Sequence, residues 1–323
     1  MVECVGIAVA LSRAPRPGTS GAAALSFVGR RLVRRLAGDG WNVRVAVRRP
    51  APARSILKAT GLDRVMVQRA DVRDQTTVAA AIAEADAVVN VVSAYVERGG
   101  ETFEAVHVRG AEMVARVAAT AGVARLVLVS GIGADPESRS PYIRARGRGE
   151  RAVQREFPGA TIVRPSAMFG PGDALFGTLA DLARLLPLLP LIGAGRTRLQ
   201  PAYVEDVAEA VARMLADPVT AGRTYEITGP NVYTLRELVD FTLRLIGRRR
   251  LLVPVPFVIA EVLARLFELL PNPPLTTGQV DLLKVDTVAS RTLPGLEDLD
   301  IQPKAVEDVV PTYIRRRRTS EPD

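Results

Sequence analysis

The sequence of 323 residues is long enough for one large α/β domain, or for a nucleotide-binding core with a smaller C-terminal lobe. One cysteine, Cys4, and one histidine, His107, exclude a disulfide framework and a zinc site, so no metal is expected. The formal charge of +8 has two interpretations: an Arg-rich composition that serves no function, or a basic face that binds anionic lipid or an acidic partner. The sequence contains no nucleic-acid recognition module, so no nucleic acid is expected as a partner.

The hydropathy of the sequence indicates where the protein is located. The sequence has no run of 18 apolar residues, and the most apolar stretch, 182–193, is interrupted by Arg184, Pro187 and Pro190. It is either core of a C-terminal lobe or a surface that touches a membrane or partner. Without a spanning segment or a clear secretory signal, we expect a cytoplasmic protein.

Helices and strands alternate from residue 28 onwards. Val28, Leu32 and Leu36 recur every four residues, which predicts a helix, and the alternating residues of 41–50 predict a strand. The apolar runs at 85–93 and 125–130 are typical of strands buried on both faces, and helices are expected at about 103–121 and 145–156. Such βαβ units predict an α/β fold of the Rossmann type, a doubly wound parallel sheet with ligands at the carboxyl ends of its strands.

The rhythm changes after Pro165. A helix is expected at 203–215 and a short strand at 225–230, and Thr234 with Glu237 forms a capping-box signature at the start of another helix. We therefore expect a Rossmann core at residues 1–165, with an atypical segment at 1–25. A smaller, mostly helical lobe at 166–313 and a disordered basic tail at 314–323 follow.

The order of these elements resembles the extended or atypical branch of the short-chain dehydrogenase/reductase superfamily. The segments that carry the resemblance are FVGRRLVRRL, LVLVSGIGAD, YIRARGRGE, VRPSAMFGPGD, RLQPAYVEDVAEAV and YEITGPNVYTLREL. The C-terminal stretch LLVPVPFVIAEVLARLFELLPNPPLTTGQVDLLKVDTVAS is most similar to the nucleotide-binding accessory subunits of respiratory complex I and their bacterial relatives. The resemblance covers residues 27 to about 313.

This resemblance implies a bound NADPH that is structural and is not turned over. It also implies complex I subunits as partners and a peripheral contact with a membrane. The location would then be the inner face of a bacterial inner membrane, or the matrix side in a mitochondrion.

The phosphate-binding turn departs from the pattern of the superfamily. Its G-x-x-G-x-x-G motif aligns with Ala23, Ser26 and Gly29, so only the third glycine is present. Ser26, Phe27 and Gly29 remain the candidates for this turn. Either residues 1–25 do not reflect the N-terminus of the family, or they include a targeting segment, or they form a working turn of another shape.

Arg48 and Arg49 end the second expected strand, where an acidic residue would select NAD(H). Because guanidinium groups match phosphate, these residues favour NADP(H) over NAD(H). The alternative is that both arginines are simply solvated at a strand end.

Other candidates lie at the ends of the third and fourth strands. The resemblance places Asp71 and Val72 beside the adenine, although Asp71 also suits a plain turn. Val92 and Ser93 would pass along the cofactor, and as sheet core they need no function.

The catalytic pattern of the superfamily, Tyr-x-x-x-Lys, is altered here. Tyr142 is followed by Arg146, which keeps a positive charge but is a poor substitute in a proton relay. Tyr142 is therefore a cofactor contact, a catalytic acid or a packing residue. Ser130 lies near the position of the assisting serine, and by analogy Pro165 and Phe169 would line the nicotinamide end.

Three functions remain open. The first is an NADP(H)-binding accessory or assembly protein without turnover. The second is an NAD(P)H-dependent reductase or epimerase that uses Tyr142. The third is a scaffold that has lost nucleotide binding, which the altered turn favours.

Overall fold

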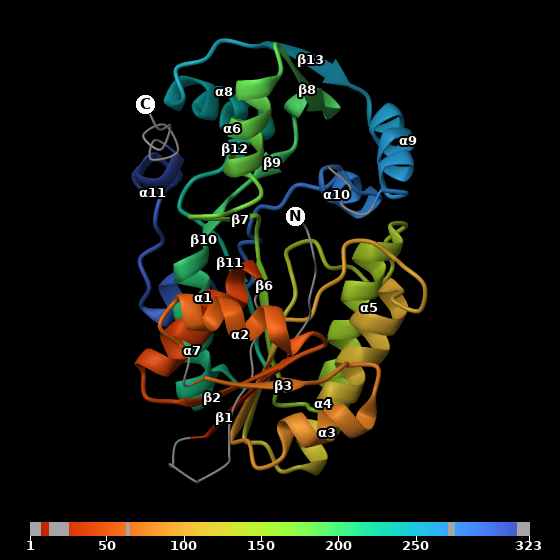
Figure 1. Ribbon diagram of the computed structural model, residues 1–323, viewed down its shortest axis with the longest axis vertical. Helices are drawn as coiled ribbons and strands as arrows, with labels where there is room; N and C mark the ends of the chain where they lie inside the picture. The colour runs from red at the N-terminus through yellow and green to blue at the C-terminus, as the bar shows by residue number, and fades with distance from the viewer. Residues whose placement is uncertain (1–7, 13–25, 63–64, 271–274, 315–323) are drawn as a thin grey trace. The chain divides into compact units, whose positions relative to one another are not determined.

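The computed structural model describes residues 8–12, 26–62, 65–270 and 275–314 (Figure 1). The chain forms two compact units. The first contains the residues up to 164 together with 207–225, and the second contains 165–206 and the residues from 226 onwards. The expected boundary at residue 165 agrees with the first change of unit, but it did not include the second segment. Residues 207–225, which hold most of one helix and the start of one strand, belong to the first unit again.

A seven-stranded sheet forms the centre of the first unit, in the order β11-β6-β5-β4-β1-β2-β3. β2 is parallel to β3, and β4, β5 and β6 are parallel to one another. This is the strand order of a doubly wound Rossmann fold, so the expected fold class is confirmed. The strands are β1 (Ala8–Ser12), β2 (Asn42–Val47), β3 (Met66–Arg69), β4 (Ala87–Asn90), β5 (Arg125–Val129), β6 (Thr161–Pro165) and β11 (Thr224–Ile227).

Strand β1 corrects the expectation of a wholly parallel sheet. It runs antiparallel to both neighbours, with Leu11 opposite Ala87 and Ser12 opposite Asn42. Its carboxyl end therefore lies at the edge where β2 and β4 begin. Helix α1 (Phe27–Gly38) leads into β2 and so starts at the opposite edge. The direct strand–turn–helix connection of a dinucleotide fold is not made between β1 and α1.

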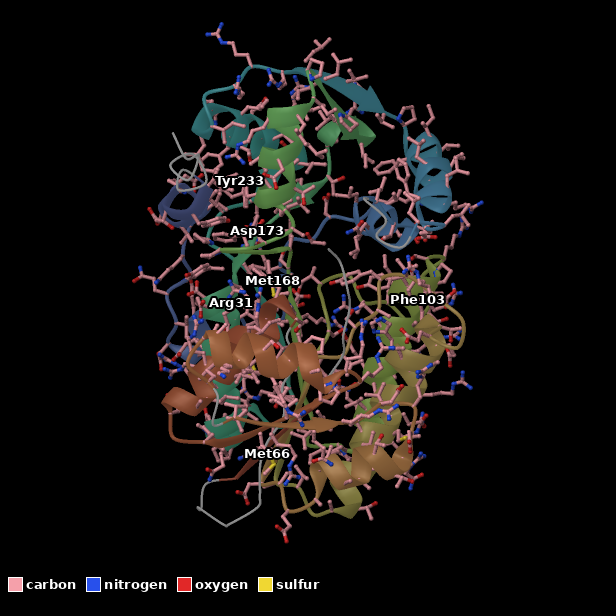
Figure 2. The ribbon with its side chains drawn as sticks, in the orientation of Figure 1. Arg31, Met66, Phe103, Met168, Asp173 and Tyr233 are labelled. Atoms are coloured by element: carbon pink, nitrogen blue, oxygen red, sulfur yellow. The ribbon has the colours of Figure 1, made fainter. Side chains whose placement is uncertain are left out.

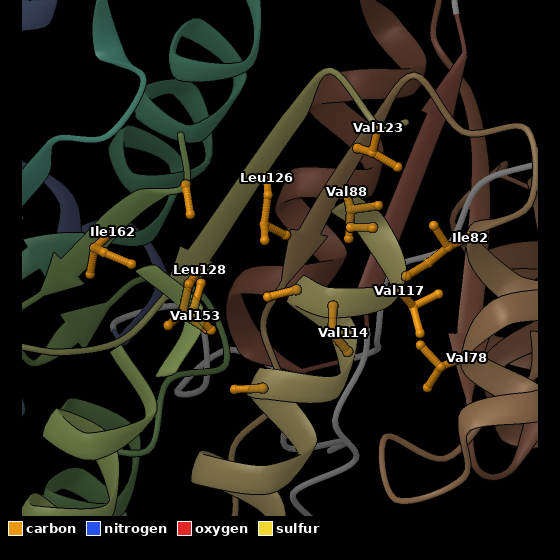
Figure 3. Packing of buried hydrophobic residues seen from close by; sticks show 14 residues of the cluster. Val78, Ile82, Val88, Val114, Val117, Val123, Leu126, Leu128, Val153 and Ile162 are labelled. Carbon is orange, nitrogen blue, oxygen red and sulfur yellow. The ribbon is translucent and has the colours of Figure 1, made fainter. Parts of the chain in front are cut away.

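Helices cover the sheet in two groups. In Figure 1, α3, α4 and α5 gather together, apart from α1, α2 and α7. The first group packs a continuous aliphatic core against β4, β5 and β6 (Figure 3). The further helices of this unit are α2 (Pro50–Ala59), α3 (Gln75–Ile82), a π-helix (Glu104–Gly110), α4 (Ala111–Thr120), α5 (Pro141–Glu156), α7 (Val204–Ala216) and a 3₁₀ turn (Pro218–Thr220).

Arg44 shows why β2 is buried along its length although its sequence alternates. Its side chain is only 6% exposed. Its Nη1 donates to the carbonyl oxygens of Ala81 and Ala83, both at 2.9 Å, near the end of α3. A charged side chain thus satisfies the last carbonyls of a helix inside the unit.

The second unit is mostly helical, as expected, with three two-stranded sheets that pair β7 with β10, β9 with β12 and β8 with β13. The predicted capping box is confirmed, because Thr234 and Glu237 bond reciprocally at the start of α8. Its elements are β7 (Met168–Phe169), α6 (Phe176–Leu185), β8 (Leu188–Ile192), β9 (Arg198–Leu199), β10 (Ala202–Tyr203), β12 (Tyr233–Thr234), α8 (Leu235–Leu245), β13 (Leu251–Val255), α9 (Phe257–Phe267), α10 (Thr277–Leu282), α11 (Val306–Ile314) and 3₁₀ turns at Gly193–Gly195 and Glu297–Leu299.

Asp173, labelled in Figure 2, organises the start of α6. Its carboxylate accepts the amides of Phe176 at 2.6 Å, Gly177 at 3.1 Å and Gly170 at 3.2 Å, and it also accepts the hydroxyl of Tyr313. Burial and the charge of Asp173 raise the pKa of Tyr313. This buried carboxylate is therefore used structurally.

Among the described residues, no helix is both long and apolar enough to cross a bilayer. The basic run of the expected tail lies within 315–323, outside the described residues.

Candidate functional site

Two adjoining hollows lie at the carboxyl ends of strands β2 to β5, where a doubly wound fold binds ligands. They share Val92 and Val106 as a common wall. The first hollow is lined by Arg48, Asp71, Val72, Arg73, Val92, Ser93, Ala94, Glu101 and Val106. The second is lined by Val92, Val106, His107, Ala111, Leu128, Val129, Ser130 and Arg146.

Two ion pairs occupy the first hollow. Arg73 donates to both carboxylate oxygens of Asp71, with Nε–Oδ1 at 2.9 Å and Nη2–Oδ2 at 2.6 Å. The side-chain hydrogen bond from Arg73 lowers the pKa of Asp71. Arg48 pairs with Glu101 across the same hollow. The hollow therefore holds two cations and two anions, which leaves it balanced in charge.

Two serine hydroxyls give these hollows unused bonding capacity. Within the described ranges, Ser93 Oγ, Ser130 Oγ and Arg30 Nε are buried side-chain atoms without a hydrogen-bond partner in the protein. Ser93 lines the first hollow and Ser130 the second. Because an unpaired buried hydroxyl costs about 1–3 kcal/mol, each serine is a position where a polar atom of a ligand would be stabilised.

The second hollow presents Arg146, while Tyr142 is enclosed behind it. Arg146 Nη1 donates to Tyr142 Oη at 2.8 Å, and Tyr142 is 0% exposed. The Tyr142 ring stacks on Tyr95 at 5.5 Å between centroids. A Cβ on Gly131 would lie 2.9 Å from the Arg146 guanidinium, so this glycine leaves room for the arginine.

Phe103, labelled in Figure 2, and His107 complete the aromatic cluster around Tyr142. Their rings meet the Tyr142 ring edge-on at centroid distances of 5.4 and 5.6 Å. His107 lies in the π-helix, and its Nε2 is 3.0 Å from the carbonyl oxygen of Ala94. Burial, followed by the charge of Arg146, lowers the pKa of His107 to about 4, so its ring is neutral near pH 7.

A metal site needs several donor side chains close together. Within the described ranges, no group of three histidine, cysteine or acidic side chains lies close enough to bind a metal ion. The arrangement suits instead an organic ligand with several polar groups spread along the ends of β2, β4 and β5.

Comparisons with known proteins agree with this geometry. Residues 24–176 match a family model described as NAD(P)H-binding. The mitochondrial NADH dehydrogenase (ubiquinone) 1 alpha subcomplex subunit 9 of Arabidopsis thaliana is 34% identical over 312 residues, which cover 93% of this chain and 78% of that protein. The subunit 9 of Rattus norvegicus is 33% identical, over 92% of this chain and 79% of its own. The chain belongs to the subunit 9 family.

An enzyme is also similar to this member of the subunit 9 family. The ceramide reductase of Caulobacter vibrioides is 32% identical over 258 residues, which cover 79% of this chain and 80% of the reductase.

Among solved structures, the dTDP-glucose 4,6-dehydratase DesIV of Streptomyces venezuelae, with NAD bound, has a TM-score of 0.68 at 22% identity, covering 91% of this chain and 94% of its own. The UDP-glucose 4-epimerase of Thermus thermophilus, in complex with NAD, has a TM-score of 0.67 at 19% identity, covering 91% and 97%. At these identities the likeness shows the fold alone.

The residues of the predicted phosphate turn do not line either hollow. Ser26 is the N-cap of α1, and its Oγ accepts the amide of Gly29 at 3.1 Å. Phe27 lies under the guanidinium of Arg31, 4.4 Å from its ring centroid. Ser26 therefore uses an amide that a pyrophosphate would otherwise bind, and Ala23 lies outside the described residues.

Three further predicted residues are not among those that line the hollows. Arg49 is exposed and precedes α2 as its N-cap. Pro165 ends β6 and is buried. Phe169 is 0% exposed and packs on Phe176 at 6.0 Å and on Tyr203 at 5.6 Å within the second unit. This contact gives the Phe169 ring a packing role.

The structure brings together the other predicted residues: Arg48, Asp71, Val72, Val92, Ser93, Ser130 and Arg146 all line the hollows. The sequence did not indicate Arg73, Glu101 or His107 as site residues, although all three line the hollows. Arg73 had a usable signal, since it follows Asp71 by two residues in a turn. Glu101 had none, because the loop after β4 lacks a recognisable spacing.

Proposed function

We propose that this chain binds NADP(H) at the carboxyl edge of its sheet and acts as an accessory subunit without turnover. The carrying observation is the pair of buried hydroxyls, Ser93 and Ser130, that lack protein partners on adjoining hollows. They fit the polar groups of the two nucleoside ends of a dinucleotide. The pyrophosphate is served less well, because Ser26 already takes the amide of Gly29.

The preference for NADP(H) rests on the end of β2. Arg48 and Arg49 stand there, and the strand end carries no acidic residue of its own for a ribose 2′-hydroxyl. Arg48 lines the first hollow, so its guanidinium is placed to meet a 2′-phosphate.

The lack of turnover rests on Tyr142 and Arg146. A bound nicotinamide would supply hydride transfer, but a reductase also needs a side chain that moves a proton to or from its substrate. Tyr142 is enclosed, and its hydroxyl oxygen accepts a bond from a guanidinium that stays charged. Arg146, which lines the second hollow, is suited to holding a ligand, whereas Tyr142 supports Arg146 from behind.

Subunits of respiratory complex I are the proposed partners, because the relatives of this chain are named as subunits of NADH dehydrogenase (ubiquinone). The location would then be the cytoplasmic side of a bacterial inner membrane or the matrix side in a mitochondrion.

A surface of the second unit supports a peripheral membrane contact. Helix α9 buries Ala260 and Ala264 against Val280, yet most of its exposed residues are also apolar, with Arg265 as the exception. A helix that carries apolar residues on both its buried and its exposed side needs further cover. We propose an anionic lipid surface, because three consecutive arginines, 248–250, precede the exposed Leu251 of β13. The exposed apolar residues of α9 are Val258, Ile259, Val262, Leu263 and Leu266.

The stretch 182–193 is divided between core and surface. Leu189 and Leu191 are buried, whereas Leu185, Leu186 and Leu188 are exposed. Part of this stretch is thus core of the second unit, and part adds to the apolar surface.

The nucleotide content of the purified protein tests the proposal. After denaturation, we expect NADPH to be released in a ratio near one per chain and to be identified by chromatography. Protein that carries no nucleotide and takes up neither NADPH nor NADH would refute the proposal and leave an interaction scaffold. The altered turn favours that outcome, and the substitutions Ala23→Gly and Ser26→Gly together should then create binding.

A second candidate is an NAD(P)H-dependent reductase or epimerase. It is favoured by the similarity to ceramide reductase and by the Tyr142–Arg146 pair, whose arginine shares a hollow with the unpartnered Ser130. Substrate-dependent oxidation of NADPH, abolished by Tyr142→Phe, would establish it in place of the accessory role.

A further inference from the structure

Glu101 faces Arg48 across the first hollow because a tight turn holds it there. Glu101 N donates to the Arg98 carbonyl at 2.9 Å, and Arg98 N donates to the Glu101 carbonyl at 3.2 Å. Gly99 within this turn takes a φ of +54°, a conformation that favours glycine. The main chain at Glu101 is therefore fixed, and the pair with Arg48 then holds its carboxylate in the hollow.

The turn is also fixed to its surroundings. On one side, Glu97 Oε1 accepts the amide of Phe103 at 2.6 Å, next to the start of the π-helix. On the other side, a Cβ on Gly100 would come within 3.4 Å of the Arg73 guanidinium. The turn that carries Glu101 thus lies directly against the charged wall of the hollow.

The pairing of Arg48 matters for the choice of cofactor. Arg73 is engaged by both oxygens of Asp71, whereas Arg48, at the end of β2, is engaged by Glu101. A carboxylate resembles two oxygens of a phosphate in charge and geometry. The two side chains are 27% and 34% exposed, so an entering anion can reach them.

We propose that Glu101 is a specificity-determining residue. Its carboxylate occupies the position beside the Arg48 guanidinium that a 2′-phosphate would otherwise take. The inference rests on the proposed nucleotide binding. NADP(H) must displace the Glu101 carboxylate, and electrostatic repulsion opposes the phosphate until the carboxylate leaves. NAD(H) has no such conflict, since its 2′-hydroxyl can donate to the same carboxylate. Glu101 therefore reduces the difference in affinity between NADP(H) and NAD(H) that Arg48 provides.

Binding of both cofactors to nucleotide-stripped protein tests this role. The dissociation constants of NADPH and NADH would be measured by calorimetry for the wild type and for Glu101→Gln. We expect the variant to bind NADPH about fivefold more tightly, the amount that a partly exposed ion pair withholds, and NADH no more tightly than before. Glu104→Gln is the matched control, because it removes one exposed negative charge nearby without lining the hollow.

The dependence on Arg48 provides a second measurement. In an Arg48→Gln background, Glu101→Gln should change NADPH affinity by less than about twofold, since the two residues act as one pair. If Glu101→Gln changes the affinities for both cofactors equally, or changes neither, the role of Glu101 is wrong while nucleotide binding stands. If neither the wild type nor any of the variants binds NADPH or NADH, the proposed function fails and this inference fails with it.

Discussion

At the scale of single residues, His107 shows how burial turns a titratable group into a source of pH dependence. Its folded pKa of about 4 lies below the ordinary value of 6.5. As pH falls through 6.5, the unfolded chain gains a proton that the native chain does not bind until about pH 4. Stability is therefore complete above pH 6.5 and decreases between pH 6.5 and 4.

We expect protonation of His107 in the unfolded chain to lower the free energy of unfolding by about 2 kcal/mol when the pH falls from about 7.5 to about 5. His107→Gln removes the titration, so the difference between the two pH values should shrink by that amount even if the variant is less stable at both. Urea unfolding of nucleotide-free protein measures it. An unchanged difference would mean that the His107 ring already accepts a proton in the native state.

At the scale of elements, the contact between α5 and the π-helix depends on one glycine. A Cβ on Gly149 would overlap the carbonyl oxygen of His107, and backbone on both sides prevents an easy shift. We expect Gly149→Ala to lower the unfolding free energy by about 3 kcal/mol, by forcing the two helices apart.

Gly38→Ala is the matched control, because nothing lies within 4 Å of its added methyl group at the end of α1. It should change stability by less than about 1 kcal/mol. Equal effects of the two substitutions in denaturant unfolding would show that helix propensity, and not the close approach to His107, sets the cost.

Elements with strong local signals could be predicted from the sequence. The apolar runs gave β4 and β5, and Thr234 with Glu237 gave the start of α8. Strand direction cannot be predicted in this way, because antiparallel β1 has the same apolar pattern that a parallel strand would have. The π-helix was likewise predicted only as helix, since its extra residue per turn leaves no sequence pattern.

The candidate site was predictable wherever a residue directly follows a strand. Arg48, Ser93 and Ser130 were found because parallel strands end at one edge of a sheet. Glu101 and His107 reach the same edge from a loop and a helix, through contacts that depend on tertiary structure. The burial of Arg44 likewise depends on tertiary structure, since the end of α3 supplies the carbonyl oxygens to which it donates.

At the scale of the whole molecule, the two units divide the proposed functions. The hollows belong to the first unit, and the apolar side of α9 belongs to the second. Membrane contact should therefore be separable from nucleotide binding. We expect Val258→Glu to weaken binding to vesicles of anionic phospholipid about tenfold, because it removes an apolar contact and adds a charge that the lipid repels. Co-sedimentation with the vesicles measures this change.

Val219→Glu provides the comparison that makes this test specific. Val219 is 63% exposed and Val258 is 70% exposed, but Val219 belongs to the first unit, whereas α9 belongs to the second. The same substitution there adds the same charge to the protein, so it should change vesicle binding by less than about twofold, an effect of net charge alone. If both variants lose binding equally, attraction depends on the overall charge of +8, and α9 does not enter the lipid. If neither loses binding, or if the wild type does not sediment with the vesicles, the apolar side of α9 is covered by protein, and the contact belongs to a partner subunit.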